Sequence, residues 1–256
     1  MRQNRVKQLW RDGKPALGGW LVIPSSFSAE VMAHQGFDWL CVDLQHGIID
    51  YQVMVTMLQA ISTTETTPIV RVPWNDPAMI MKALDAGAYG VIVPLVNTPA
   101  EAAAAVAACR YPPKGMRSSG PTRAVYYGGR DYLEHANDEI ICLCMIETRQ
   151  GIANIEEICG VPGLDGVYIG PADLSLALGL PPRSDVEDQI HLDTVQRIRE
   201  VAHSSGIRAG MHCASAPFAT KKAREGFDLV MLTSDSACMV RSAGEQLAAL
   251  RTGITG

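Results

Sequence analysis

Residues 37–63 read FDWLCVDLQHGIIDYQVMVTMLQAIST, and this stretch contains one complete strand–helix unit. Residues 37–44 are a mostly apolar run, which indicates a strand buried on both faces of a parallel sheet. Residues 50–63 begin with an Asp and repeat apolar side chains at about the 3.6-residue period of a helix. Buried strands that alternate with helices are typical of α/β folds.

The same unit recurs along the chain. Strands are predicted at residues 18–24, 37–44, 67–73, 89–96, 139–147, 164–170, 207–213 and 228–235. Amphipathic helices are predicted at residues 28–36, 50–63, 76–87, 98–110, 148–160, 193–206, 216–226 and 236–251. Eight units in 256 residues match the count of a (β/α)8 barrel, or TIM barrel. We therefore predict an α/β fold with a single catalytic domain over residues 1–256.

One connection, residues 112–138, is longer than ordinary barrel loops and is rich in Gly, Pro and Arg. It follows the fourth predicted helix, so it starts at the end of the barrel opposite the carboxyl ends of the strands. We expect it either to rise toward the active face or to join subunits. The sequence leaves open whether residues 113–138 close on a substrate.

Composition narrows the class of protein. The chain is 47% hydrophobic and 19% charged, with a net charge of −5 and scattered Lys and Arg, which does not favour a nucleic acid or a membrane as partner. No signal-peptide pattern or apolar run of about 20 residues is found, so a cytoplasmic location is expected. Seven cysteines, among them Cys41, Cys142 and Cys144 in predicted strands, favour buried reduced thiols over disulfides or a zinc site.

Polar residues follow several of the predicted strands at their carboxyl ends. These residues are Asp43, His46, Arg71, Glu147 and Asp173. In (β/α)8 barrels the carboxyl ends of the strands form one rim, where catalytic residues gather. The sequence therefore places these five side chains in one small volume.

Each of these residues also has a structural interpretation. Asp43 could cap the next turn, His46 could be a structural histidine, and Arg71 could be a buried ion-pair partner. Glu147 and Asp173 would repel each other unless a cation or an arginine lies between them. Carboxylate oxygens suit Mg2+ or Mn2+, with water completing the coordination.

The segment GPADLS, residues 170–175, follows the sixth predicted strand. Gly170 and Pro171 fix a tight turn, and Ala172 and Asp173 open a short helix whose free N–H groups point at the rim. Such a helix start can bind an anion, for example a substrate carboxylate. An ordinary strand-to-helix turn with an Asp near the helix start is the alternative.

The chain also resembles a known family. The stretches FDWLCVDLQHG, RVPWNDPAMIMKALDAG, GVIVPLVNTPAEA, RYPPKGMRS, MIETRQGIANI and LDGVYIGPADLS are similar to the HpcH/HpaI aldolases, which are metal-dependent pyruvate aldolases. The resemblance covers about residues 18–240. Two positions depart from the usual pattern, since Met145 stands where many relatives have Gln and Gln45 stands where they often have Glu.

The resemblance implies a (β/α)8 fold and a divalent metal, Mg2+, Mn2+ or Co2+, held by Glu147 and Asp173. It implies that Arg71 contacts the keto oxygen of the substrate and that His46 is the base. Asp43 would support the site, and Asp85 would approach His46 from a neighbouring subunit. Family members assemble as homo-oligomers, trimers or hexamers, and exchange their last helix between subunits.

The substrate-binding residues expected from the motifs are Arg71, Gln45, Gly170, Pro171 and Ala172. The expected reaction is cleavage of a 4-hydroxy-2-oxo acid to pyruvate and an aldehyde, and its reverse. Aldolases stabilise the electron pair left by carbon–carbon cleavage with a lysine Schiff base or a metal-bound enolate. The second route is favoured because the six lysines lie outside the strand ends: Lys7, Lys14, Lys82, Lys114, Lys221 and Lys222.

Three other functions remain open. A citrate-lyase-like enzyme acting on CoA thioesters would use similar metal-binding carboxylates. An oxaloacetate decarboxylase would use the same metal and enolate without an aldehyde. A barrel that has lost catalysis and serves as a scaffold would need no metal.

Overall fold

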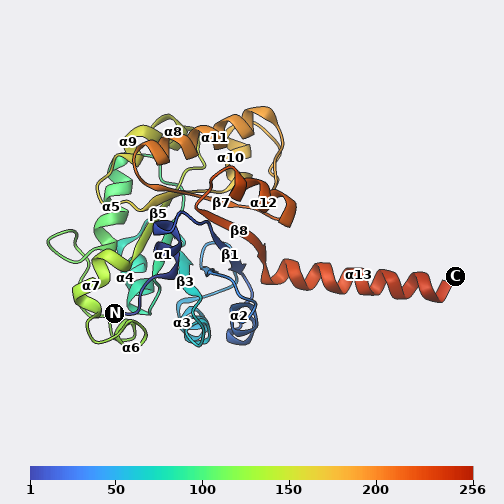
Figure 1. Ribbon diagram of the computed structural model, residues 1–256, viewed down its shortest axis with the longest axis horizontal. Coiled ribbons are helices and arrows are strands. Elements are labelled where there is room, and N and C mark those ends of the chain that lie inside the picture. The colour runs from blue at the N-terminus through green and yellow to red at the C-terminus, as the bar shows by residue number, and fades with distance from the viewer. Residues whose placement is uncertain (256) are drawn as a thin grey trace.

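The computed structural model describes residues 1–255, and it forms the closed parallel barrel that the repeat predicts (Figure 1). The strands follow one another around the barrel in chain order from β1 to β8. Their bounds are β1 (Ala16–Leu21), β2 (Trp39–Asp43), β3 (Thr67–Arg71), β4 (Gly90–Val93), β5 (Ile141–Met145), β6 (Gly166–Ile169), β7 (Arg208–His212) and β8 (Leu229–Ser234). The prediction of a (β/α)8 barrel is confirmed.

Helices surround the strands. They are α1 (Arg5–Arg11), α2 (Ser26–Ala33), α3 (Tyr51–Ile61), α4 (Pro77–Asp85), α5 (Pro99–Cys109), α6 (Ala124–Gly128), α7 (Tyr132–Glu139), α8 (Arg149–Ala153), α9 (Ile155–Cys159), α10 (Pro171–Ala177), α11 (Gln189–Ser204), α12 (Ala216–Arg224) and α13 (Asp235–Thr255). Most of the helices that follow strands have a Ser, Thr or Asp N-cap whose side chain accepts a backbone N–H, and four of these caps are the first residues of the predicted helices at 50–63, 76–87, 98–110 and 148–160. These caps are Ser25, Asp50, Asp76, Thr98, Thr148 and Ser215.

The structure corrects one helix and adds others. The helix predicted at residues 148–160 is two short helices, α8 and α9, because Asn154 leaves helical geometry between them. The Asn154 side chain donates instead to the carbonyl oxygen of Asn97, 2.7 Å away in the loop after β4. Helices α1, α6 and α7 were not predicted from the sequence.

The barrel interior is filled by large side chains in alternate strand positions. Trp39 and Cys41 point inward along β2, and Met145 and Tyr168 do so from β5 and β6. Gly18 on β1 makes room for Trp39, since a Cβ at this glycine would lie 2.0 Å from the indole ring. The same alternation sends Asp43 inward, one layer above Cys41.

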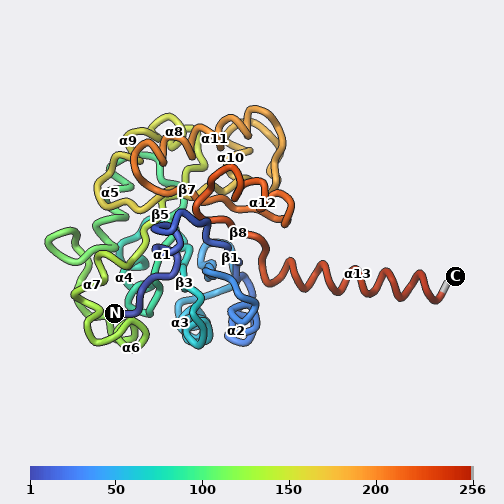
Figure 2. Tube along the Cα trace, in the orientation of Figure 1, coloured from blue at the N-terminus to red at the C-terminus, as the bar shows by residue number. Residues whose placement is uncertain are grey.

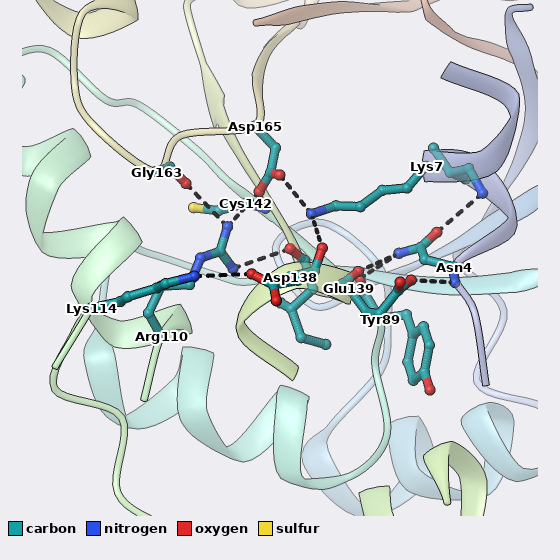
Figure 3. A network of polar contacts seen from close by, with 12 residues as sticks. Asn4, Lys7, Tyr89, Arg110, Lys114, Asp138, Glu139, Cys142, Gly163 and Asp165 are labelled. Carbon is teal, nitrogen blue, oxygen red and sulfur yellow. Dashed lines mark hydrogen bonds and ion pairs between the residues drawn. The ribbon is translucent and has the colours of Figure 1, made fainter. Parts of the chain in front are cut away.

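The amino end of the barrel is closed by α1 and a polar network (Figure 3). Asp165 is its centre, since this carboxylate binds Arg110 at 2.6 Å, Lys7 at 2.8 Å and the backbone N–H of Cys142 at 2.8 Å. The Asn4 side-chain amide donates to the carbonyl oxygen of Glu139 at 2.8 Å. Polar groups at this end of such barrels serve stability, and here they fix α1 under the strands.

The long connection does not rise to the carboxyl ends of the strands within this chain. It contains α6 and α7, and Figure 2 shows both helices near the N-terminus of the chain. Arg2 donates its backbone N–H to Gly128 at 2.6 Å, and Arg123 binds the carbonyl oxygen of Ala86 at the end of α4. Of the two expectations, a rise toward the active face is not what this chain shows, and contact between subunits stays a prediction.

Helix α13 extends away from the barrel as a single exposed helix (Figure 1). One stripe of its surface carries Val240, Ala243, Leu247, Leu250 and Ile254, at the three- and four-residue spacing of one helix face. Val240 is 75% exposed and Leu250 60%. An apolar helix face of this kind normally packs against another surface.

An open groove of about 430 Å3 lies on the outer surface of β8 and β1, beside α12. Its lining residues are Pro15, Leu17, Ala216, Ala219, Thr220, Ala223, Arg224, Val230 and Leu232. In a barrel, the helix after β8 normally packs there. The extended α13 leaves this surface uncovered within the chain.

All seven cysteines are free thiols, and all but Cys238 are buried, as the sequence predicted. Burial raises the pKa of the Cys41 and Cys213 thiols. Among residues 1–255, no helix has the length and apolar character needed to cross a membrane.

Candidate active site

A cavity of about 350 Å3 opens at the carboxyl ends of the strands. It is lined by Trp20, Val22, Asp43, His46, Arg71, Ser184, His212, Cys213, Ala214, Met231, Thr233, Ser234 and Ala237. Asp43, His46 and Arg71 were predicted to meet at this rim, and the structure brings them together. The outer groove on β8 and β1 shares none of these residues and is a separate surface.

Asp43 and Arg71 form a two-point ion pair at the floor of this cavity. Arg71 Nε lies 2.8 Å from Asp43 Oδ1, and Arg71 Nη2 lies 2.6 Å from Asp43 Oδ2. Burial opposes both charges, but the mutual hydrogen bonds and attraction lower the pKa of Asp43 and raise the pKa of Arg71. Both side chains are therefore charged, and the guanidinium is fixed in one orientation.

Asp43 also holds the turn that follows β2. Its Oδ1 accepts the backbone N–H groups of Gln45 at 3.0 Å and His46 at 3.3 Å. Its Oδ2 accepts the Trp20 indole N–H at 3.1 Å. The capping interpretation and the ion-pair interpretation of Asp43 and Arg71 are both correct, because one carboxylate does both.

His46 lies exposed at the edge of the cavity, in the turn that Asp43 holds. Within residues 1–255, no group is found hydrogen-bonded to its imidazole ring. Gln45 is half-buried, and its Oε1 is buried without a hydrogen-bond partner among the described residues. The His46 ring is thus free to contact a bound molecule.

Glu147 follows β5 and points toward the rim. Its Oε1 accepts the backbone N–H of Leu95 at 3.0 Å, and its Oε2 is buried with no hydrogen-bond partner among residues 1–255. Leu95 has a φ of 54°, a strained conformation for a leucine that aims its N–H at the carboxylate. Gly170 leaves space on the other side, since a Cβ there would lie 2.5 Å from Glu147 Oε2.

The raised pKa of Glu147 indicates a buried carboxylate whose negative charge is not balanced by a neighbouring positive charge. Burial and the negative charge of Asp173 raise its pKa to about 7, against the lowering effects of the Leu95 N–H and the Arg71 charge. Asp173 is exposed in the first turn of α10. Gly170, Pro171 and Ala172 form the start of this helix, so the GPADLS segment lies where it was predicted.

A divalent cation fits this pair of carboxylates. An orphaned oxygen on Glu147 and the nearby Asp173 are acceptors only, and Mg2+ is commonly held by one or two carboxylates with water and substrate oxygens. No group of three or more His, Cys, Asp and Glu side chains suited to a metal occurs in the described part of the chain. Two protein ligands would leave the other positions of the ion for water and substrate.

Asp85 is not at this rim in its own chain. It ends α4, and its carboxylate accepts a hydrogen bond from Arg117 Nη2 at 2.7 Å. Arg117 is buried between the rings of Tyr111 and Tyr132, and it also donates to the Tyr132 hydroxyl at 3.1 Å. The approach of Asp85 to His46 of a neighbouring subunit stays a prediction.

An aromatic cluster that was not predicted from the sequence lies at the cavity. His212 ends β7, and its ring packs edge-on against Trp20 with 4.9 Å between centroids. Tyr168 stacks on Trp20 with 5.8 Å between centroids, and its hydroxyl lies 3.3 Å from His212 Nδ1. The rule applied to other strand ends would have found His212, since it is the polar residue that closes the apolar strand at residues 207–213.

Comparison with known proteins adds independent evidence. A family model described as HpcH/HpaI aldolase/citrate lyase matches residues 17–250. A hydroxypyruvate/pyruvate aldolase of Rhizorhabdus wittichii is 44% identical over 248 residues, covering 97% of this chain and 99% of the relative. A 4-hydroxy-2-oxo-heptane-1,7-dioate aldolase of Escherichia coli is 38% identical over 265 residues, covering 98% and 99%.

A solved structure is similar as well. The crystal structure of an HpcH/HpaI aldolase/citrate lyase family protein from Burkholderia cenocepacia matches with a TM-score of 0.90 and 31% sequence identity. The match covers 97% of this chain and 99% of that one. Fold and sequence comparisons therefore point to the same group of proteins.

Proposed function

The chain belongs to the HpcH/HpaI aldolase/citrate lyase family and is a carbon–carbon lyase of the aldolase type, and from this premise we propose that it cleaves 4-hydroxy-2-oxo acids. The products would be pyruvate and an aldehyde, and the same site would catalyse the reverse addition. Relatives named for pyruvate and for heptanedioate substrates support this reaction class.

The observation that carries the proposal is the buried, unpartnered Oε2 of Glu147 beside Asp173. These two carboxylates would hold Mg2+, Mn2+ or Co2+. When bound, such an ion supplies positive charge that polarises a keto oxygen and stabilises the negative charge formed there. The Arg71 charge acts on Glu147, whose pKa it lowers, so Arg71 can add to the same effect.

Arg71 would bind the keto oxygen of the substrate. Asp43 engages one N–H each of Nε and Nη2, so the two N–H groups of Nη1 and the second one of Nη2 are left for a ligand. The pair fixes these donors before substrate arrives, and donors positioned in advance lower the barrier most effectively. The start of α10, Gly170 to Ala172, would receive the substrate carboxylate, with Gln45 near the same oxygens.

His46 would accept the proton of the 4-hydroxyl, directly or through one water. The bond between C3 and C4 then breaks, C4 leaves as the aldehyde, and the electron pair forms the enolate of pyruvate with its charge on the keto oxygen. Protonation at C3 completes pyruvate. A positioned base typically contributes about 10²- to 10⁴-fold to the rate.

The lysine positions support this route over a Schiff base. Lys7, Lys82 and Lys222 lie in α1, α4 and α12 rather than at strand ends. Lys222 is buried but pairs with Glu225 at 2.8 Å, outside the cavity. Among residues 1–255, no lysine lines the cavity at the rim.

We also propose that the chain is a homo-oligomer, a trimer or hexamer, in which α13 is exchanged between subunits. The apolar stripe of α13 and the open apolar groove on β8 and β1 are complementary surfaces that the same chain leaves apart. The stripe of one chain would fill the groove of its partner. Asp85 of the partner subunit would then lie near His46, with its carboxylate fixed by Arg117.

One experiment tests the reaction class. Purified protein is stripped of metal, and pyruvate release is measured over a panel of 4-hydroxy-2-oxo acids before and after Mg2+ or Mn2+ is restored. The proposal expects release only with metal and an aldehyde product in equal amount. Pyruvate from oxaloacetate alone, a strict need for an acyl-CoA, or no turnover and no exchange of the pyruvate methyl protons would each refute it.

A further inference from the structure

The cavity at the rim is not centred on the two carboxylates. Glu147 and Asp173 follow β5 and β6, whereas the cavity is lined by residues of β1, β2, β3, β7, β8 and their loops. If the 2-oxo acid end of a substrate is held at Glu147, Asp173 and Arg71, the rest of its carbon chain extends toward β7, β8 and β1. This argument rests on the proposed function, and it concerns the part that becomes the aldehyde.

The lining of that region is polar but carries little charge. Its polar side chains beyond the Asp43–Arg71 pair are His46, Ser184, His212, Thr233 and Ser234. Within residues 1–255, Arg71 is the one arginine or lysine in the lining; its charge is paired with Asp43, and its remaining N–H groups would serve the keto oxygen in the proposed function. A second substrate carboxylate would find no free cation there.

His212 is the most firmly held of these polar groups. Its ring is fixed edge-on against Trp20, and its Nδ1 is 3.3 Å from the Tyr168 hydroxyl. Burial and the nearby Arg71 charge lower the pKa of His212 to about 4, although Asp43 acts in the opposite direction. The ring is therefore neutral at pH 7 and carries one proton.

The Tyr168 hydroxyl favours one position for that proton, because His212 Nδ1 is the one hydrogen-bond partner of this buried hydroxyl among residues 1–255. Burial raises the pKa of Tyr168 well above its ordinary value, so its O–H stays intact and can donate to Nδ1. A ring that accepts at Nδ1 has its proton on Nε2. No described group is found bonded to Nε2, so its N–H is a donor available to the cavity.

We infer that His212 is a specificity-determining residue whose Nε2–H donates a hydrogen bond to an oxygen on the aldehyde, adjacent to its reacting carbonyl. The preferred acceptor is then a short, uncharged aldehyde with a neighbouring hydroxyl group. An unsubstituted alkyl aldehyde would leave the Nε2–H without a hydrogen-bond partner. A site built to hydrogen-bond a hydroxyl group discriminates strongly against an analogue that lacks it, because the donor in the site is then unpaired. An aldehyde with a terminal carboxylate lacks a cation partner.

Two matched acceptors test this inference in the addition direction. Glycolaldehyde and acetaldehyde differ by one hydroxyl group, and the ratio of their kcat/KM values with pyruvate reports the proposed hydrogen bond. We expect wild type to favour glycolaldehyde and His212→Leu to reduce the ratio about tenfold, the effect of one lost neutral hydrogen bond. His212→Gln, which keeps a side-chain N–H, should retain most of the preference, and His34→Leu on the exposed end of α2 is the control.

A second measurement does not depend on turnover. Nitrogen-15 NMR of the metal-free wild-type protein at pH 7 should show His212 as the neutral form with its proton on Nε2, and Tyr168→Phe should change that tautomer. A proton on Nδ1, a charged ring, or a wild-type ratio near one would overturn the inference while leaving the proposed aldolase reaction intact. If metal-loaded protein neither exchanges pyruvate methyl protons nor forms aldol product, both the reaction and the role of His212 are wrong.

Discussion

Asp43 and Arg71 are direct register partners at the last position where β2 and β3 pair, and their side chains meet above the barrel interior. The strand register itself therefore brings the two charges together, without a loop to position them. The Arg71 guanidinium also lies 4.9 Å above the Trp20 ring, whose N–H bonds the same carboxylate. The three residues form one rigid unit on which the site is built.

Removal of one charge from this unit should be costly. Asp43→Asn leaves a buried guanidinium without its anion, and loss of one partner of a buried ion pair costs about 3 kcal/mol or more in the free energy of unfolding. At about 2–4 °C per kcal/mol for a chain of this size, the melting temperature should fall by roughly 6–12 °C. Asp138→Asn, which breaks the exposed pair with Lys114 at 3.0 Å, is the matched control and should have a much smaller effect. Equal effects in calorimetry would contradict the rigid-unit interpretation.

Metal affinity should depend on both rim carboxylates. Glu147→Gln replaces the proposed carboxylate ligand with a neutral amide. Loss of a residue that only hydrogen-bonds a metal ligand weakens metal binding by roughly 10- to 100-fold, so loss of the ligand itself should weaken Mn2+ binding by more than this. Asp173→Asn should act in the same direction. Isothermal titration of metal-free protein with Mn2+ measures the change, and Glu157→Gln on the exposed face of α9 is the control. Unchanged affinity in both rim variants would place the ion elsewhere.

The barrel could be predicted from the sequence because most strands are short, mainly apolar runs and several helices begin at a recognisable cap. The parts that were missed have other causes. Helix α1 is short and buries only Val6 and Trp10, which pack against the interior of the barrel at its amino end. Two apolar residues do not make a recognisable helical pattern in the sequence. The break at Asn154 depends on a tertiary hydrogen bond to Asn97, which local sequence does not reveal.

The site was predicted in part for a similar reason. The strand-end rule found Asp43, Arg71 and Glu147 because acidic and basic residues are rare inside barrels. The same rule applied to β7 would also have pointed to His212, but the contacts with Trp20 and Tyr168 that hold its ring are not visible in the sequence. The unsatisfied oxygen on Glu147 is also invisible in sequence, since it depends on Gly170 and on the backbone turn at Leu95.

Loss of the base should separate catalysis from metal binding. His46→Ala should lower kcat for pyruvate release by about 10²- to 10⁴-fold, because no positioned group then accepts the hydroxyl proton. Mn2+ affinity should stay near wild type, since His46 follows β2 and the proposed ligands follow β5 and β6. His135→Ala, at an exposed position of α7, controls for loss of an imidazole. Wild-type turnover in His46→Ala would remove this residue from the scheme.

The exchange of α13 makes a prediction about mass in solution. Light scattering should give a mass of several chains for wild type, and Leu247→Asp or Val240→Asp should shift it toward one chain, since each places a charge on the apolar stripe. Ala249→Asp lies on the other side of the same helix and should leave the mass unchanged. A wild-type monomer, or identical masses for stripe and control variants, would mean that the stripe is not an interface.

The low pKa of His212 makes a prediction about stability and pH. The pKa of His212 is about 4 in the folded chain and near the ordinary value of 6.5 in the unfolded chain, because burial and the Arg71 charge oppose protonation more than Asp43 favours it. Between these pH values the unfolded state binds more protons, so the free energy of unfolding falls as the pH falls from 6.5 toward 4. Urea unfolding at pH 7 and pH 5 should show a loss about 2 kcal/mol larger in wild type than in His212→Gln. His34→Gln, at an exposed position, should retain the wild-type difference, and equal losses in wild type and His212→Gln would show that His212 is not a buried neutral histidine.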